Sequence, residues 1–127
     1  MPSSDGWPSM MNAPEIGGLS RFLDVAAFRT GLIASNLANI DTPHYRTRDL
    51  NFLQELQRAE GEFDYALYSP LAQPVRGLME RPDGNNVSLE RESLLLADTQ
   101  LRYNLGVQLL RDFFHTLSSA IHEGSSS

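Results

Sequence analysis

The hydrophobic residues between Ser88 and about His122 recur at alternating three- and four-residue steps, the pattern of a long amphipathic helix. Only Gln100 interrupts the row. Ser88 is suited to cap the N-terminus of this helix, and Glu90 and Glu92 place negative charge in its first turn. Because an isolated helix is marginally stable in water, the row predicts packing against a partner. Its members are Leu96, Tyr103, Val107, Leu110, Phe114, Leu117 and Ile121.

Three further leucines of this segment form a second apolar stripe. At ~100° per residue, Leu94, Leu101 and Leu105 lie almost opposite the main row. One partner within the chain covers one stripe of a helix, so the second stripe admits two interpretations. The helix is either central to a small bundle or in contact with neighbouring molecules in an assembly.

A second amphipathic helix is predicted from Leu19 to about Asp41, and it must end before Pro43, which disfavours the α conformation at Thr42. Gly31 costs roughly 1 kcal/mol relative to alanine in a helix interior, which is tolerated mostly where packing is tight or the helix bends. Pairing the two helices buries both rows, in a parallel or antiparallel arrangement that the sequence leaves open. The N-terminal row consists of Leu23, Ala26, Thr30, Ile33, Leu37 and Ile40.

The predicted fold is therefore mostly α, with long N- and C-terminal helices paired as in a coiled coil. Residues 1–18 are rich in proline, glycine and serine and are expected to form a flexible lead. The single domain then spans residues 19–122, as a helix (19–41), an irregular middle (42–87) and a second helix (88–122), followed by a tail at 123–127. The middle is expected to hold an extended segment (45–51), a short helix (52–59) and a short strand near residues 63–68.

Composition narrows the possible functions. A formal net charge of −6 argues against a general nucleic-acid binder, which needs clustered Lys and Arg. Zero cysteines exclude disulfides, thiolate catalysis and cysteine-ligated zinc. No apolar run is long enough to span a bilayer, and the first 18 residues lack the basic and apolar regions of a cleavable secretion signal.

No nucleotide-binding, nucleophile-elbow or metalloprotease motif is present, and the sequence predicts no catalytic residue, cofactor or metal ligand. His115 and His122 share one face of the C-terminal helix, with Asp112 one turn before His115. A metal-dependent enzyme built on these three residues is an alternative, but a single exposed helix face supplies two ligands at most, and a zinc site requires three or four.

Residues 34–45, with the sequence ASNLANIDTPHY, resemble the N-terminal signature of bacterial flagellar rod and hook proteins, roughly A-x-N-[IL]-A-N-x-x-T-P-G-Y. His44 stands where this signature has glycine. Three further stretches are similar to those of the proximal-rod subunits: RDLNF at 48–52, DGNNVSLERE at 83–92, and LRY at 101–103 within a helix that ends in LSSAI. The resemblance covers about residues 19–122.

The resemblance implies a structural subunit, without catalysis, that polymerises through its terminal helices into a drive shaft carrying torque from the membrane ring to the hook. The implied partners are further copies of the chain, other rod proteins, the ring–rod junction protein and the flagellar type III export apparatus, with no nucleic acid and no small-molecule substrate. The implied location is the basal body, reached by export without a cleavable signal peptide.

The assembly contacts are expected on both long helices and on the turn that joins the first helix to the middle. A filament grown through contacts that do not close needs more than one apolar face per subunit, so the second leucine stripe is expected to face neighbours. The alternative is a soluble helical binding module or export adaptor that remains in the cytoplasm. The expected interface residues are Leu23, Ile33, Asn36, Leu37, Asn39, Thr42, Pro43, Tyr45, Leu94, Leu96, Leu101, Tyr103, Leu105, Val107, Leu110, Phe114, Leu117 and Ile121.

Overall fold

A computed structural model describes residues 13–61 and 68–126 of the chain. Two long helices, α1 (Ala13–Ala38) and α3 (Leu89–Ser126), flank a middle that contains one short helix, α2 (Phe52–Gly61). Two short strands, β1 (Arg48–Asp49) and β2 (Gln73–Pro74), pair antiparallel, with Arg48 opposite Pro74 and Asp49 opposite Gln73. The mostly helical fold predicted from the sequence, with long terminal helices and a short central one, is confirmed.

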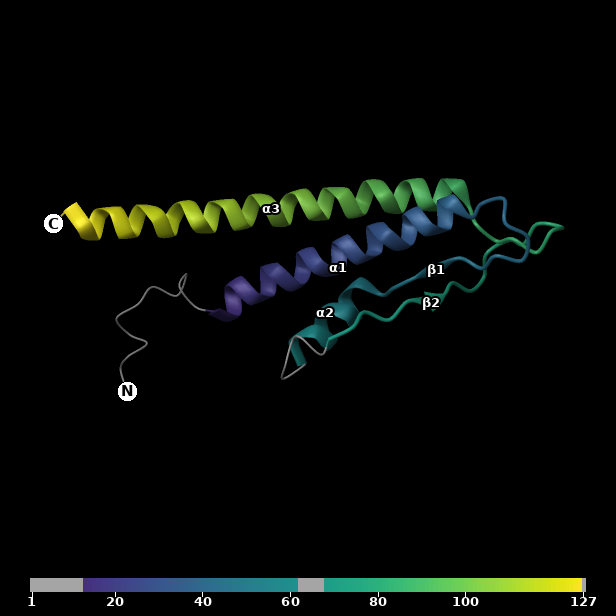
Figure 1. The fold of residues 1–127 in the computed structure, drawn as a ribbon, viewed down its shortest axis with the longest axis horizontal. Helices are drawn as coiled ribbons and strands as arrows, with labels where there is room; N and C mark the ends of the chain where they lie inside the picture. The colour runs from purple at the N-terminus through teal and green to yellow at the C-terminus, as the bar shows by residue number, and fades with distance from the viewer. Residues whose placement is uncertain (1–12, 62–67, 127) are drawn as a thin grey trace.

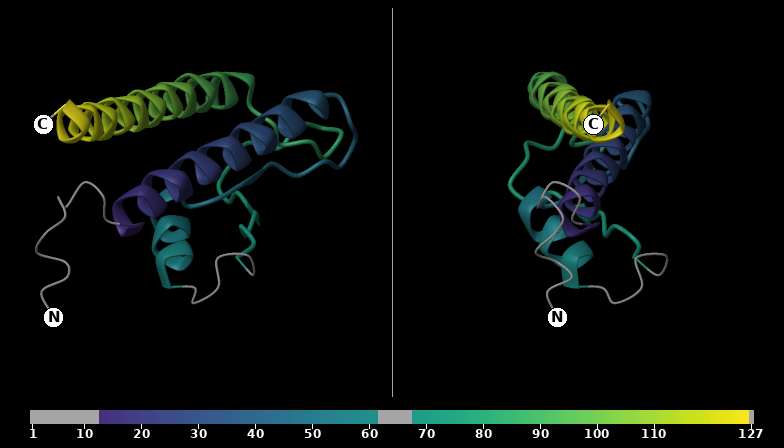
Figure 2. Two further views of the ribbon diagram at one scale, coloured as in Figure 1. Left: turned by 60° about the vertical axis from the view of Figure 1, so that its left-hand side comes forward. Right: turned by 90° about the vertical axis from the view of Figure 1, so that its left-hand side faces the viewer.

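The elements form three layers (Figures 1 and 2). Helix α1 lies in the middle, with α3 along one side and α2 with the β1–β2 pair along the other. The two long helices run antiparallel, which settles the orientation that the sequence left open. Contacts at two levels fix this pairing, because Asn36 of α1 meets Glu92 near the start of α3, whereas Phe22 and Leu23 meet Gly106.

Several boundaries differ from the sequence-based expectation. Helix α1 begins at Ala13, so residues 13–18 of the expected flexible lead are helical, and it ends at Ala38 rather than Asp41. Helix α3 continues to Ser126, through most of the expected tail. The predicted strand near residues 63–68 falls mainly outside the described residues, and its described member, Tyr68, is not in a strand.

The face of α3 that packs against α1 is centred on a row of polar and small residues. Glu92, Thr99 and Gly106 are buried and follow one another at intervals of seven, the repeat of a packed helix seam. A Cβ on Gly106 would lie 2.8 Å from Leu23 Cδ2 and 3.0 Å from Phe22 Cδ1. Glycine at this position therefore allows the two helices to approach closely.

Most of the apolar row predicted as the centre of this seam lies along its flank instead. Leu96, Val107, Leu110 and Leu117 are half-buried, but Tyr103, Phe114 and Ile121 are 40%, 51% and 62% exposed. One reason is that the closest approach occurs at a glycine, which hydrophobicity does not reveal. Another is that α3 extends past the start of α1, so its last turns have no α1 residue beside them (Figure 1).

The apolar core lies on the other side of α1, where this helix meets α2 and the segment before it. Val25, Ala26, Leu50 and Phe52 are buried, and Phe22 packs edge-on against the Phe52 ring with the centroids 5.2 Å apart. This arrangement makes α1 the shared partner of both other layers.

A buried carboxylate ties the returning chain to α2. Glu55 is 3% exposed and accepts hydrogen bonds from Arg58 of its own helix, from the Tyr68 hydroxyl at 2.8 Å and from the Leu71 backbone N–H at 3.2 Å. Each of these donors offsets the cost of burying the charge, and the bonds from Tyr68 and Leu71 hold that part of the chain against α2.

Candidate assembly site

The two segments that carry the sequence motifs meet at one end of the molecule. We call this end the tip; it comprises residues 39–45, after α1, and residues 81–88, before α3 (Figure 1). Asn85 joins the segments, since its buried side-chain amide donates hydrogen bonds to the backbone carbonyls of Asn39 and Thr42, both at 2.8 Å. Its Oδ1 accepts from the Val87 backbone N–H. The Asn85 side chain therefore holds the turn after α1 against the segment that precedes α3.

Asn36 is the most completely hydrogen-bonded residue of the motif. Its Nδ2 donates to the Arg48 carbonyl at 2.8 Å and to Glu92 Oε2 at 3.2 Å, while its Oδ1 accepts from the Tyr45 hydroxyl at 3.0 Å and from the Arg48 N–H at 3.1 Å. An amide side chain has two donors and two acceptor sites, and all four are used here. At 1% exposure, Asn36 acts inside the subunit, where it connects α1, β1 and α3.

The second asparagine of the motif shapes the turn itself. Asn39 Nδ2 donates to the Ser35 carbonyl one turn earlier, and Asn39 Oδ1 accepts from the Thr42 hydroxyl at 3.0 Å. These local bonds compete with helix continuation, which accounts for the end of α1 at Ala38. Thr42 and Pro43 are left exposed at the end of the molecule.

His44 has a backbone conformation that side chains rarely adopt. Its φ is 63°, in the left-handed region, and its N–H donates to the Asp83 carbonyl at 2.9 Å. Gly84, with φ 84°, lies directly against it, and a Cβ there would be 2.5 Å from His44 Nδ1. The glycine of the family signature at position 44 would adopt this conformation without strain.

A charged network behind the tip connects all three layers. Arg29 of α1 makes a bidentate pair with Asp49 at 3.0 and 2.9 Å, and Arg91 of α3 contacts the same carboxylate at 2.8 Å. Arg91 also donates at 2.9 Å to Glu92, which is fully buried. Burial on its own would raise the pKa of Asp49, but the Arg29 hydrogen bonds and charge, the Leu50 N–H and Arg91 together hold this pKa below its usual value of 3.8.

A second arginine supports the tip from inside. Arg81 donates from Nη1 to the Val87 carbonyl at 2.9 Å and from Nη2 to the Ile40 carbonyl. Its backbone N–H also donates to the Asn85 carbonyl at 2.9 Å. Arg81 therefore bridges the segment after α1 and the segment before α3 through backbone groups. These bonds fix the position of the tip relative to both helices.

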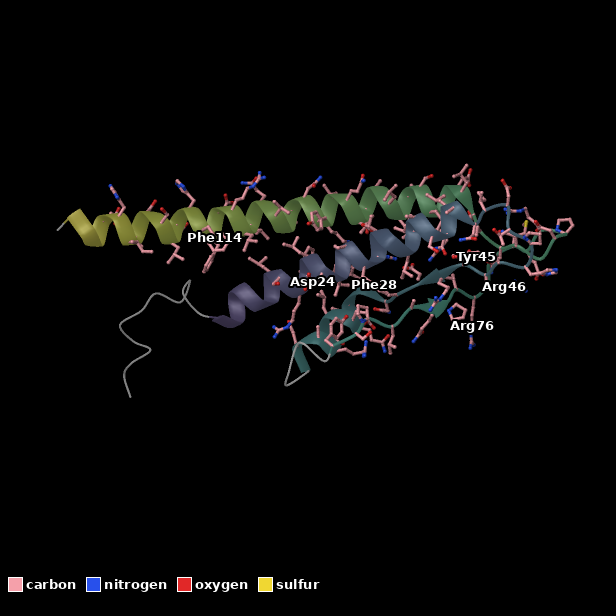
Figure 3. The ribbon with its side chains drawn as sticks, viewed as in Figure 1. Asp24, Phe28, Tyr45, Arg46, Arg76 and Phe114 are labelled. Carbon is pink, nitrogen blue, oxygen red and sulfur yellow. The ribbon has the colours of Figure 1, made fainter. Side chains whose placement is uncertain are left out.

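The predicted interface residues fall into two structural groups. Some are turned inward: Ile33 and Asn36 are buried, and half-buried are Leu23, Leu37, Asn39, Tyr45, Leu96, Val107, Leu110 and Leu117. The others reach the surface: Thr42, Pro43, Leu94, Leu101, Tyr103, Leu105, Phe114 and Ile121. Tyr45 lies at the tip, whereas Phe114 projects from α3 near the start of α1 (Figure 3).

The charged network was not predicted from the sequence. Arg29, Asp49 and Arg91 were not singled out, and Glu92 was interpreted only as a charge that favours the helix start. A signal was available, because Asp49 lies in the predicted extended segment and Glu92 lies at the seven-residue repeat of the α3 seam. Pairing such residues requires knowledge of which segments meet, and the sequence pattern alone does not provide it.

Two features of the described part of the chain bear on other functions. In residues 13–61 and 68–126, no helix has the length and apolar character needed to cross a bilayer. Over the same ranges, no three His, Cys, Asp or Glu side chains gather closely enough to hold a metal ion, so the alternative built on Asp112, His115 and His122 has no converging ligand set.

The chain was compared with family models and with individual proteins of known function. No family model matches the chain, but individual proteins do. The flagellar basal body rod protein FlgB of Cereibacter sphaeroides is 32% identical over 120 residues, which cover 84% of this chain and 93% of that protein. The chain belongs to the FlgB family. FlgB of Salmonella typhimurium is 28% identical over 81% of the chain and 89% of its own length, and FlgB of Borrelia hermsii is 28% identical over 80% and 90%.

The FlgB relationship confirms the resemblance drawn from the two motifs. These motifs are far apart in the sequence, at residues 34–45 and 83–92, yet they meet at the tip. In this member of the FlgB family, Asn36, Asn85 and Glu92 hold the turn after α1, β1 and the start of α3 together as one unit.

Proposed function

We propose that this protein is a subunit of the flagellar proximal rod and polymerises through its terminal helices into the shaft that transmits torque from the membrane ring to the hook. The relationship to flagellar basal body rod proteins supports this role. The observation that carries it is the double-sided character of α3. One face packs on α1, while Leu94, Leu101 and Leu105, which lie ~100–160° around the helix from that face, are 73%, 69% and 56% exposed.

These leucines are costly to leave in water. Each contributes roughly 1.5–3 kcal/mol when fully buried, and a row of three on one helix face is typical of a surface that meets another protein. Helix α3 also continues beyond the start of α1, with Ile121 exposed on its seam side. A subunit whose apolar surfaces exceed what its own fold covers is suited to an assembly with several neighbours.

The same proposal includes the expected partners and location. They are further copies of the chain, other flagellar rod proteins, the ring–rod junction protein, and the type III export apparatus, which would pass the chain unfolded and without cleavage to the basal body. The buried seam suits such a route, because Glu92, Thr99 and Gly106 contribute little apolar burial at the centre of the α1–α3 contact. A subunit of modest stability before assembly is the expected consequence.

The direct test is to isolate detergent-extracted hook–basal bodies from the source bacterium and to search them for this chain by mass spectrometry. The proposal predicts that the chain co-purifies with the rod and rings and remains with them after salt washing. Finding the chain only in the soluble cytoplasmic fraction of flagellated cells would contradict the rod role and favour the adaptor alternative.

A further inference from the structure

A groove runs along the open edge of the α1–α3 contact. It has a volume of about 500 Å³ and is lined by Ala27, Thr30, Gln100, Tyr103 and Asn104. None of these side chains carries a charge. The groove therefore continues the intramolecular helix seam outward and presents an uncharged surface on which another helix could lie.

The α1 wall of this groove continues as an exposed face of small side chains. Ala27, Gly31, Ala34 and Ala38 lie on one side of α1 at three- and four-residue spacing, and all are exposed. Helices approach closely where such residues face a partner, since the partner's larger side chains then have room to insert. Because all four residues are exposed in the described structure, neither α2 nor α3 covers this face, although α3 borders it at Ala27.

Gly31 has no explanation inside the subunit. A Cβ built on this residue meets nothing within 4 Å, in contrast to Gly106, where it would collide with Leu23 and Phe22. A glycine in a helix interior is unfavourable relative to alanine, and no contact or positive φ in this structure requires it. A close approach from outside the subunit is one physical reason for a glycine at this position.

A matching surface lies on another side of the same molecule. Leu101 is separated from Tyr103 of the groove by ~160° around α3, so the exposed leucine row cannot reach the groove within one chain. The spacings agree: Leu94, Leu101 and Leu105 are separated by seven and four residues, as are Ala27, Ala34 and Ala38, or ~10.5 and ~6 Å along a helix. Rows of large and small side chains with equal spacing can interlock.

We propose that the groove and the small-residue face of α1 receive the leucine row Leu94–Leu101–Leu105 of a second copy of this chain. This inference rests on the proposed rod function and specifies its lateral contact. Because the two surfaces are different parts of the molecule, the contact is heterologous and leaves a free leucine row and a free groove at the two ends of every pair. Repetition therefore adds subunits without limit unless the rotation closes a ring.

The ion pair beside the leucine row is compatible with this contact. Asp98 and Arg102, beside the row on α3, pair with each other at 3.0 Å, so the approach of an uncharged groove leaves neither ion without its partner. Burying an unpaired charge would oppose association strongly, whereas covering a pair that is already formed opposes it much less.

The first test uses Gly31→Leu, which fills the small-residue face without touching the subunit's own core. The isolated variant should have an unchanged or higher thermal midpoint, because leucine is a better helix former than glycine and the space is open. Its amount in purified basal bodies should fall by about tenfold or more, as expected for an overpacked interface. Gln57→Leu, on the exposed face of α2, is the matched control and should be incorporated normally.

Normal incorporation of Gly31→Leu would overturn the inference and leave the rod function standing. A lowered midpoint of the isolated variant would also overturn it, since Gly31 would then serve the subunit's own fold. Absence of the unmodified chain from basal bodies would contradict the proposed function itself, so the two failures are distinguishable.

The second test uses the absence of natural cysteines. Ala34→Cys and Leu101→Cys chains are produced together in flagellated cells, and the isolated basal bodies are oxidised. A disulfide between the two variants is expected, whereas the control pair Leu53→Cys with Leu101→Cys, in which position 53 lies on exposed α2, should not crosslink. Predominant crosslinks between two Leu101→Cys chains would show a symmetric contact and overturn the inference.

Discussion

At the scale of single residues, the structure assigns the motif asparagines to work within the subunit. Asn36 uses all four hydrogen-bonding sites of its amide, and Asn85 supports the backbone of the turn that follows α1. The sequence indicated that residues 36–45 matter but placed them at an interface between subunits. Within that stretch, Ala38 and residues 41–44 are exposed and so remain available for neighbours.

The left-handed conformation of His44 leads to a stability prediction. Replacement His44→Gly should raise the free energy of unfolding by about 1 kcal/mol, because a left-handed φ is strained for a residue with a Cβ and unstrained for glycine. Chemical denaturation of the isolated protein measures this change. Gly84→Ala should have the opposite effect, since its φ is also positive and its Cβ would meet His44 Nδ1. An unchanged or lower stability of His44→Gly would mean that the His44 side chain makes a compensating contact.

The charged network predicts a response to acid. The pKa of Asp49 is lower in the folded state than its ordinary value of 3.8, so its ionised form stabilises the fold fully above that value. This contribution is lost as the pH falls below about 3.8 and through the folded-state pKa. The free energy of unfolding should therefore fall between pH 6 and pH 2, a range that spans about two units on either side of the ordinary pKa. The substitution Asp49→Asn should remove this fall.

The matched control for this experiment is Asp98→Asn. Asp98 also pairs with an arginine, but both side chains of that pair are 45% exposed, and such surface pairs contribute little. The acid response of this variant should equal that of the unmodified protein. If Asp49→Asn retained the full drop below pH 4, the acid sensitivity would belong to other carboxyl groups.

At the scale of elements, the hydrophobic pattern predicted which segments are helical but not how they meet. Three- and four-residue steps identified both long helices, and the local chemistry of Asp41–Pro43 identified the end of the first. The centre of the α1–α3 seam escaped prediction because Glu92, Thr99 and Gly106 occupy it, and a search for apolar residues passes over them. The predicted extended segment 45–51 contains β1, but its pairing with β2 was not predicted, since two-residue strands are held by long-range contacts rather than by their own propensity.

Close approach of α1 and α3 at Gly106 yields a prediction at this scale. Gly106→Leu should destabilise the isolated protein by about 2 kcal/mol, because the new side chain collides with Leu23 and Phe22 and forces the helices apart. Gly124→Leu introduces the same residue in the last turns of α3, where a Cβ meets nothing within 4 Å. Its thermal midpoint should stay the same or rise. Equal behaviour of the two variants would contradict the close packing of α1 on Gly106.

At the scale of the whole molecule, the contacts that hold the chain together lie on different surfaces from the exposed apolar residues. The polar tip, the charged network and the glycine-centred seam hold one chain together. The leucine row and the last turns of α3 are exposed, and we propose that they meet other molecules. The opposite direction of Leu94, Leu101 and Leu105 was predictable from helical geometry, and their exposure in the structure agrees with it. Their occupant was not predictable, since a sequence pattern shows that a face is apolar without showing what covers it.

We propose that one face of α3 packs within the subunit and that the opposite face contacts neighbouring subunits. One variant tests this proposal most directly. It replaces Leu94, Leu101 and Leu105 together by serine. Because these side chains are mostly exposed, the isolated variant should melt within a few degrees of the unmodified protein. Quantitative mass spectrometry of basal bodies from cells that produce the variant should show that it is excluded from the rod. Incorporation at the normal level, with normal folding, would contradict the claim.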